Sequence, residues 1–263
     1  MRFQHRIVRG AFTLVELLVV IGIIGLLIAL ILPVVHRSRA HARQVECAAR
    51  LRQLIAAAHL YQADHKVAPP PPFIPAVSQV VPVAHTQPFL EMTLAYLGDK
   101  HTVIDPAQNT AQLPQVLRCP SYILTGQFAD VVTAWGIPFW YTGYMYSARL
   151  DEPPNLGTVL KPERTADARM RHRRVIWSDS LAVFDISGTY SYAYFHQSGG
   201  KPTDPVWGMF PDYDTMRGYN RGWSDGSVEW VPKDLTGLAP GSPSAYASYK
   251  AFAPGLFDAY YVY

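Results

Sequence analysis

The sequence predicts an α+β protein in which one long N-terminal helix precedes a β-rich globular head. The first 65 residues combine an apolar run with an amphipathic pattern, and they reach the prolines at 69–72 without a cluster of helix-breaking residues. From residue 73 onward, all six tryptophans and most tyrosines occur among frequent glycines and prolines. Aromatic segments bounded by turn residues are typical of short β-strands.

The composition excludes several classes of protein. The chain has 263 residues, 49% of them apolar, and only two cysteines. This length suffices for one or two folded domains, and two cysteines are too few for a disulfide-dense mini-protein. The 23 Lys and Arg against 20 Asp and Glu give a formal net charge of +3. Such a small excess does not indicate nucleic acid as a general partner.

Residues 11–35 are predicted to span a membrane. Their only charge is Glu16, and a helix of this length reaches about 37 Å, more than the ~30 Å hydrocarbon core. Residues 1–10 hold three arginines and no acid, which favours a cytoplasmic N-terminus, although further arginines closely follow the span. The alternative is a secretory signal cleaved after the A-x-A-type site at 40–42. The length of the run and the basic flank at 36–39 speak against it.

Glu16 lies only a turn inside the apolar run. A carboxylate there costs on the order of a few kcal/mol unless a partner neutralises it. One interpretation is a side chain that reaches the lipid headgroups near the basic leader. The other is an acid that pairs with a positive group inside the membrane or in an assembled helix core.

Residues 12–18, FTLVELL, follow the short basic leader and resemble the processing signal of type IV prepilins and type II secretion pseudopilins. The resemblance implies that a prepilin peptidase removes residues 1–11, cutting after Ala11 on the cytoplasmic side. Phe12 then becomes the N-methylated N-terminus, and Glu16 pairs with the terminal amine of a neighbouring subunit.

The residue before the cut in that family is usually Gly, so cleavage after Gly10 is the alternative. Cleavage after Ala11 is preferred because it keeps the family's spacing from Phe12 to the acid, and it still presents a small residue to the peptidase. Gly25 and Pro33 stand where pilin helices commonly have a glycine and a helix-bending proline.

The expected domains follow from these patterns. Residues 12–35 form the transmembrane and assembly helix, and residues 36–66 extend it as an amphipathic helix into the head. The whole helix, bent near Pro33, would be roughly 80 Å long and would end at the prolines. The head, 67–263, is expected to be one small antiparallel sheet packed on the helix, as in pilins. Its expected strands are 140–148, 174–178, 188–195 and 227–231.

A second resemblance concerns the head. Three segments resemble a bacterial pseudopilin-like family: Cys47 with a following Leu-x-Gln, Cys119-Pro120-Ser121, and Asp225-Gly226-Ser227-Val228. That family has a C-terminal signature of His, nine residues, then Asp-Gly. Here Thr215 stands in place of the His, whereas Gly218 and Asn220 fit the intervening pattern, so the signature is partial. We expect Asp225 and Gly226 to form a hairpin turn.

The two cysteines are candidates for a disulfide. In the predicted topology Cys47 and Cys119 both lie outside the cytoplasm, where thiols are oxidised. A bond closing this loop of about 70 residues would stabilise the fold by roughly 4 kcal/mol from chain entropy. Two unpaired, partly buried thiols are the alternative.

The sequence offers little evidence of metal binding or catalysis. The nine histidines show no ligand spacing typical of a metal site. Asp212 and Asp214, with Asp225, are a weak calcium candidate, because Met216 and Arg217 break the EF-hand pattern. No nucleophile elbow, P-loop or dinucleotide fingerprint is present. We therefore expect no metal, no cofactor and no enzymatic activity.

The resemblance implies a structural subunit, anchored in the bacterial inner membrane by one pass and assembled through its helix into a pilus or pseudopilus. Its partners would be a prepilin peptidase and other pilin-like subunits. The alternative is a membrane-anchored or pilus-tip module whose tryptophans and tyrosines bind a glycan or another surface. A third hypothesis, DNA capture by the arginine-rich helix at 36–65 and the basic run at 169–174, is not favoured, and no nucleic-acid partner is expected.

Overall fold

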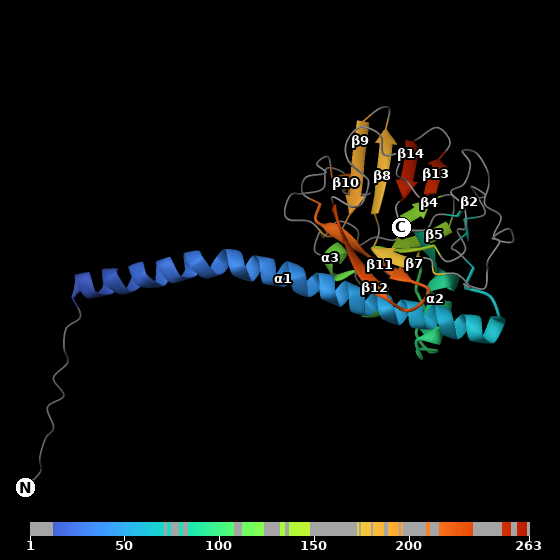
Figure 1. Ribbon diagram of the computed structural model, residues 1–263, viewed down its shortest axis with the longest axis horizontal. Helices are drawn as coiled ribbons and strands as arrows, with labels where there is room; N and C mark the ends of the chain where they lie inside the picture. Colours follow the sequence, from blue (N-terminus) through green and yellow to red (C-terminus); the bar gives the residue numbers. More distant parts are fainter. Residues whose placement is uncertain are drawn as a thin grey trace, which may run out of the picture. The chain divides into compact units, whose positions relative to one another are not determined.

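The structure is a computed structural model of the chain (Figure 1). It describes the following residues: 13–70, 73–74, 79–80, 84–107, 112–123, 132–134, 137–147, 173, 175–179, 181–186, 189–194, 196, 209–210, 216–233, 249–253 and 257–261. These fall into two compact units, Met1–Ala42 and Arg43–Tyr263.

Helix α1, Leu14–His65, confirms the single long helix and runs through Pro33 without a break. It begins with a capping box. The Thr13 N–H and the Thr13 hydroxyl each donate to Glu16 Oε2 at 2.8 Å, and the Glu16 N–H donates to Thr13 Oγ1 at 3.2 Å. This reciprocal pair satisfies backbone groups that a helix start otherwise leaves unpaired.

The helix ends before the prolines that were expected to stop it. Lys66 has a φ of 63° and donates its N–H to the carbonyl of Gln62 at 2.8 Å. A left-handed residue with this hydrogen bond is a recognised helix C-cap. The helix is therefore terminated at Lys66, three residues before Pro69, and the proline run is not what ends it.

The N-terminal unit exposes its apolar residues. Within the described part, 13–42, the Leu, Ile and Val side chains of α1 from Leu14 to Val34 are all about half exposed or more. The helix is long and apolar enough to cross a membrane, and its most apolar stretch is not buried by the described residues.

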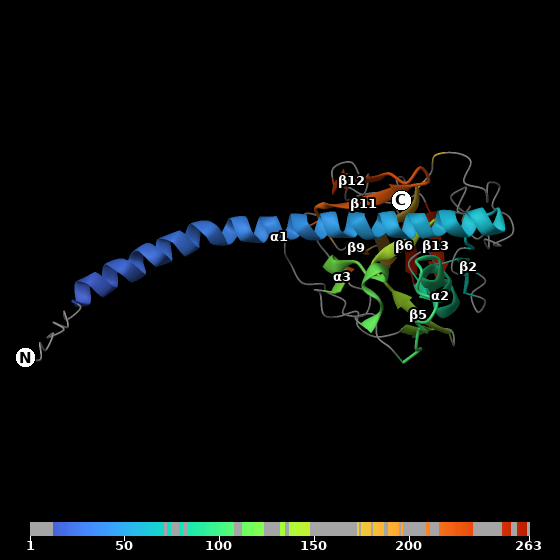
Figure 2. The same ribbon diagram turned by 90° about the horizontal axis from the view of Figure 1, so that it is seen from below.

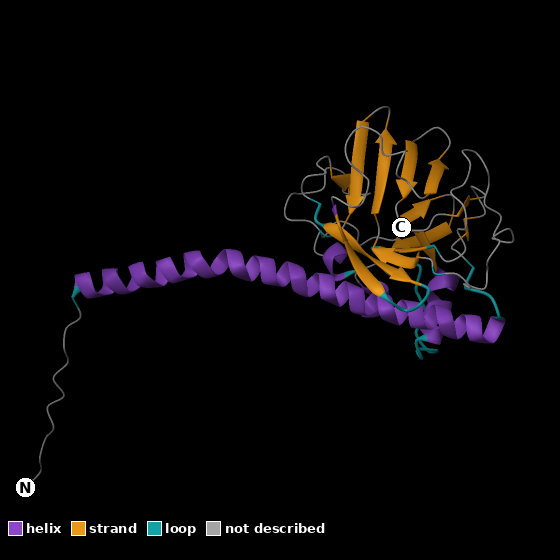
Figure 3. Cartoon of the chain, viewed as in Figure 1, coloured by secondary structure: helices purple, strands orange, loops and turns teal. Residues whose placement is uncertain are grey.

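The described strands of residues 43–263 form four sheets, and every pair of neighbouring strands is antiparallel (Figure 3). Two small sheets are β1 (Phe73–Ile74) with β2 (Gln79–Val80), and β3 (Ala84–Thr86), β5 (Ile137–Tyr141) and β4 (Val132–Ala134) in that order. A four-stranded sheet has the order β12 (Val228–Pro232), β11 (Gly218–Trp223), β7 (Val175–Asp179) and β6 (Tyr144–Tyr146). A five-stranded sheet has the order β10 (Met209–Phe210), β9 (Thr189–Tyr194), β8 (Leu181–Ile186), β14 (Phe257–Tyr261) and β13 (Tyr249–Ala253). Three short helical segments complete the described part of the unit: α2 (Gln87–Tyr96), η3 (Gln115–Leu117) and α3 (Pro120–Ile123).

The sequence prediction of one small sheet is therefore too simple, although the α+β layout with antiparallel pairing is confirmed. Three expected strands match β7, β9 and β12 to within a residue or two at each end. The fourth, at 140–148, is wrong. It is divided between β5 and β6, which belong to different sheets, because Gly143 with a φ of 82° turns the chain between them.

The core of this unit forms around the second half of α1, which runs beside β11 and β12 (Figure 2). Its buried stripe faces the aromatic core residues of the head. The stripe consists of Cys47, Leu51, Leu54, Ile55 and Ala58, each at most 3% exposed, and the head contributes Phe89, Trp140, Tyr144, Tyr146 and Trp177. The 3- and 4-residue spacing of the stripe places its members on one side of the helix.

Helix α1 approaches β11 closely because Gly222 has no side chain. A Cβ at Gly222 would lie 2.5 Å from Ile55 Cδ1 and 3.2 Å from the carbonyl oxygen of Trp177. Glycine thus sets the distance between the helix and the sheet at this point.

Substitution Gly222→Ala is expected to destabilise the protein by about 1–3 kcal/mol through overpacking against Ile55. Urea unfolding of the full chain in detergent measures the change. The double variant Gly222→Ala with Ile55→Val removes the clashing Cδ1 atom and should recover part of the loss relative to Ile55→Val alone. If Gly222→Ala costs the same in the wild-type chain and in the Ile55→Val background, this packing explanation is wrong.

Candidate functional site

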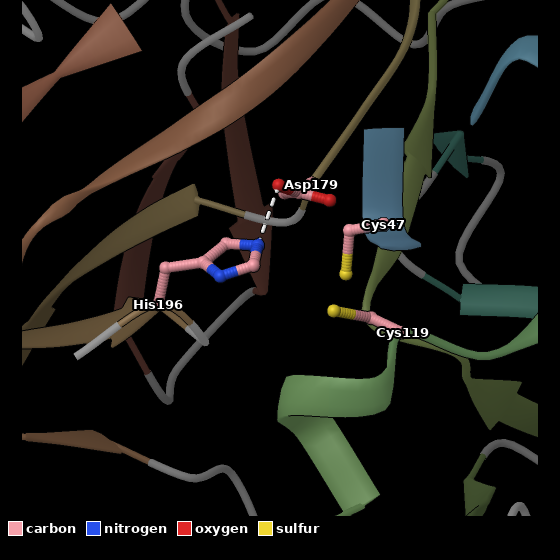
Figure 4. Close-up of side chains that lie close together, drawn as sticks. All are labelled: Cys47, Cys119, Asp179 and His196. Atoms are coloured by element: carbon pink, nitrogen blue, oxygen red, sulfur yellow. Dashed lines mark hydrogen bonds and ion pairs between the residues drawn. The ribbon is translucent and has the colours of Figure 1, made fainter. Parts of the chain in front are cut away.

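Four chemically reactive side chains meet in the core of residues 43–263 (Figure 4). Cys47 lies on α1, Cys119 immediately precedes α3, Asp179 ends β7, and His196 lies two residues after β9. One potential ligand atom from each residue lies within 4.8 Å of the other three, and all four residues are buried. The cluster thus joins a helix to three separate segments of the head.

Asp179 is the polar centre of this cluster. Its Oδ2 atom accepts hydrogen bonds from the Asn220 backbone N–H at 2.8 Å, from Asn220 Nδ2 at 2.7 Å and from His196 Nε2 at 2.8 Å. Asn220 lies on β11, the strand next to β7. The Oδ1 atom of Asp179 is buried and has no hydrogen-bond partner among the described residues.

His196 is held through both ring nitrogens. Its Nδ1 lies 3.2 Å from the Ser121 hydroxyl, and Nε2 contacts Asp179. The ring also packs edge-on against Trp230, with centroids 5.3 Å apart and an interplanar angle of 81°. These contacts fix the imidazole with its Nε2 side toward the carboxylate.

Burial and neighbouring charges have opposite effects on the pKa values of residues in the cluster. Burial disfavours the imidazolium, but the charge of Asp179 and the hydrogen bond to it prevail and raise the pKa of His196 to about 10. Burial raises the pKa of the Cys47 thiol, and the adjacent Cys119 raises it further. Burial also opposes ionisation of Cys119, yet hydrogen bonds to Cys47 and His196 outweigh it and lower the pKa of Cys119. Protons therefore stay on His196 and Cys47.

The chemistry open to these residues is restricted by their burial. Cys119, His196 and Asp179 are the residue types of a nucleophilic triad. However, none of the three is more than 5% exposed, so in this conformation solvent and substrate do not reach the thiol. The donor set suits a metal ion or a bond between the two sulfurs.

The predicted disulfide remains a prediction. The structure brings Cys47 and Cys119 together, as that prediction requires, and it holds both as free thiols. Sequence reasoning reaches this proximity because the chain has only two cysteines, so a disulfide within it has a single possible pairing.

Sequence reasoning did not find the other two members of the cluster. Asp179 and His196 lie in no motif, and their spacing from each other and from the cysteines matches no known ligand pattern. Only the pairing of β7 with β11 and the course of the chain after β9 bring them together.

The residues predicted for processing and assembly lie in or before the N-terminal helix. Glu16 occupies the first turn of α1 and binds Thr13. Gly25 has open space around its Cα, and Pro33 lies inside the helix. The described residues do not include Gly10, Ala11 and Phe12, nor Asp212, Asp214 and Thr215.

The Asp225–Gly226 hairpin turn is confirmed. It joins β11 to β12, with Gly226 at a φ of 87°. Asp225 Oδ1 accepts from the Ser227 N–H at 2.9 Å and from the Ser227 hydroxyl at 2.5 Å. These bonds and the adjacent Arg173 lower the pKa of Asp225 to about 2. The turn is a structural element, separate from the cysteine cluster.

Several of the described aromatic and basic residues have structural partners. Trp140 and Trp177 are core residues, which weakens the hypothesis of a surface that binds glycans through tryptophan. Arg173, the described member of the basic run at 169–174, forms an ion pair with Asp225 and stacks over Trp223 at 4.0 Å from the ring centroid. Arg221 lies over the same ring.

In the metal-free, reduced protein, Asp179→Asn is expected to lower the pKa of His196 from about 10 toward its ordinary 6.5, because the charge that opposes burial is lost. NMR titration of the full chain, labelled with [13C]histidine, measures this shift. Because the folded-state pKa is raised, the stabilisation by His196 is complete below pH 6.5 and is lost as pH rises through 10.

The urea midpoint of the wild-type protein should therefore fall between pH 6.5 and pH 10 by more than that of Asp179→Asn. The control is Asp105→Asn, an exposed aspartate that caps the Ala107 N–H outside the cluster. An unchanged His196 titration in Asp179→Asn would show that the carboxylate does not control this imidazole.

No family model matches the chain, and no curated protein or solved structure is significantly similar to it.

Proposed function

We propose that this protein is a pilin-like structural subunit that a prepilin peptidase processes and that assembles through α1 into a pilus or pseudopilus. The observation that carries the proposal is the joint occurrence of the FTLVE motif and an apolar helix whose side chains from Leu14 to Val34 are exposed among the described residues. Both features lie within residues 12–35.

The exposed apolar surface supports this proposal on energetic grounds. Burying one Leu, Ile or Val side chain contributes about 1.5–3 kcal/mol. Residues 14–34 expose a continuous series of such side chains around the whole helix. A lipid bilayer covers this surface in the free subunit, and neighbouring helices cover it in a filament. Transfer between the two environments exchanges one apolar cover for another, so the helix is suited to both.

Glu16 has two separable roles under this proposal. Its side chain accepts the Thr13 N–H and so starts the helix, which a neutral Gln also does in a capping box. Its charge is then available for the terminal amine that cleavage before Phe12 creates on a neighbouring subunit. The first role is a property of the described structure, and the second belongs to the proposal.

The proposal places the chain in the bacterial inner membrane with residues 1–11 in the cytoplasm and residues 43–263 outside. Its partners are the prepilin peptidase and further pilin-like subunits of the same or related sequence. The exposure of the apolar side chains in residues 14–34 within the described part of the structure supports membrane insertion, and the basic leader supports this orientation.

The first test concerns processing. We expect the protein recovered from membranes to begin at N-methylated Phe12 when a prepilin peptidase is co-expressed, and to retain residues 1–11 when it is not. Intact mass and N-terminal sequencing measure this. A chain that stays uncut with the peptidase would leave a plain membrane anchor, and a chain beginning at Arg43 would indicate ordinary secretion.

The second test separates the two roles of Glu16. Glu16→Gln keeps the capping group and removes the charge, so insertion and helix formation should persist while filament incorporation falls at least several-fold. Glu16→Ala should impair both the cap and incorporation. Sedimentation of sheared filaments, with immunodetection, measures incorporation, and Glu46→Gln on the outer side of α1 is the matched control. Normal incorporation of Glu16→Gln would contradict the charge-pairing mechanism.

A further inference from the structure

We infer that Cys47, Cys119, Asp179 and His196 form a structural site for one Zn²⁺ ion in the core of the head. Two sulfurs, one imidazole nitrogen and one carboxylate oxygen converge from four segments of the chain, and the side chains point toward one another (Figure 4). This inference is independent of the proposed filament function.

The donor types favour zinc over harder ions. Thiolate and imidazole are the usual ligands of structural Zn²⁺, with a carboxylate as an accepted fourth ligand. Ca²⁺ and Mg²⁺ take oxygen ligands almost exclusively. A site with two sulfurs among four donors therefore selects against both of them.

The spacing of the donor atoms is close to what tetrahedral coordination needs. At Zn–S of about 2.3 Å and Zn–N or Zn–O of about 2.0–2.1 Å, neighbouring ligand atoms are about 3.3–3.8 Å apart. The four donor atoms here lie within 4.8 Å of one another, so binding an ion shortens the widest separation by at most about 1–1.5 Å.

The Asp179 carboxylate gives the most direct indication of a bound ion. Its Oδ1 atom is buried, and no described residue gives it a hydrogen bond. A carboxylate oxygen without a partner in the core is costly, and a cation removes that cost. The Oδ2 atom is already saturated by Asn220 and His196, so Oδ1 is the oxygen left to bind an ion.

The surrounding residues form the outer support that metal sites usually have. Asn220 donates twice to Asp179 Oδ2, so the carboxylate stays oriented when His196 turns its Nε2 toward the ion. The Ser121 hydroxyl lies beside His196 Nδ1 and accepts the proton of the tautomer whose Nε2 is free to coordinate.

Binding changes the protonation of the cluster and involves no oxidation. Cys119 binds as the thiolate, and Zn²⁺ displaces the thiol proton of Cys47 and the Nε2 proton of His196, which leave to solvent. The two thiolates, the carboxylate and the ion then carry a combined charge of about −1. Four protein ligands close the coordination sphere, which is the arrangement of a structural site.

The function of such a site would be to fasten α1 to the head. Cys47 lies on the helix, and the other three ligands lie in segments far from it in the sequence. A disulfide between Cys47 and Cys119 would join only two of these segments and would leave Asp179 Oδ1 without a partner.

The test uses the full chain, purified from membranes in detergent with a thiol-alkylating reagent present during lysis. We expect about one Zn²⁺ per chain by inductively coupled plasma mass spectrometry. We also expect Cys47 and Cys119 to resist alkylation until a chelator is added to the unfolded protein. Reloading with Co²⁺ should produce the thiolate-to-cobalt charge-transfer band and the visible bands of a tetrahedral site.

Variants identify the ligands. His196→Gln and Asp179→Asn should each weaken Zn²⁺ binding at least tenfold in a competition titration with a chromogenic chelator. His101→Gln, which changes an exposed histidine outside the cluster, should not alter it. The Co²⁺ spectrum of the wild-type protein keeps the test decisive if a variant fails to fold.

Two results would overturn the inference. One is a wild-type chain isolated with a Cys47–Cys119 disulfide, seen as a mass lower by two hydrogens. The other is a chain with two free thiols that contains no zinc and binds neither Zn²⁺ nor Co²⁺ in titration. Neither result concerns processing at Phe12, so failure of the zinc inference would not contradict the proposed filament function.

Discussion

The burial of one stripe of α1 is the interaction on which the rest of the head depends. Leu51, Leu54 and Ile55 are at most 1% exposed, and each contributes about 1.5–3 kcal/mol by burial. Their register also fixes where Cys47 faces, one turn earlier on the same side. The close approach at Gly222 then sets the depth of the helix against β11, and β11 carries Asn220 to the cysteine cluster. Packing and site geometry therefore share one cause.

The same helix must satisfy two different environments along its length. Apart from Glu16, residues 14–34 present apolar side chains on every side of the helix, so packing one face against another segment would leave the other faces exposed. From Arg43 onward the apolar residues narrow to a stripe, and charged pairs such as Glu46 with Arg50 occupy the other faces. A helix with both patterns is suited to a protein that is held by lipid or neighbouring helices at one end and folds at the other.

Structural features that depend on residues close together in the sequence could be predicted, and features that depend on distant residues could not. The helix start, its periodicity and the Asp225–Gly226 turn depend on residues a few positions apart, so the sequence reveals them. The helix end agrees with the predicted boundary at 66 to within one residue, but its cause differs. The sequence indicated the proline run, whereas Lys66 ends the helix in a left-handed conformation that is uncommon for a lysine. The cluster of Cys47, Cys119, Asp179 and His196 could not be predicted from the sequence for a different reason. Asp179 and His196 meet only through strand pairing between distant segments, and no pattern of spacing records that.

Asn220 shows how a residue in a sequence signature can have a purely structural role. It fits the pattern between Thr215 and Asp225. In the structure its Nδ2 group donates to Asp179 Oδ2 and to the carbonyl of Gln44 on α1, using both amide hydrogens. Its backbone N–H also binds the same carboxylate. Asparagine is required here because no other side chain of this length offers two donors on one nitrogen, and an aspartate would repel Asp179. This single residue thus ties strand, carboxylate and helix together.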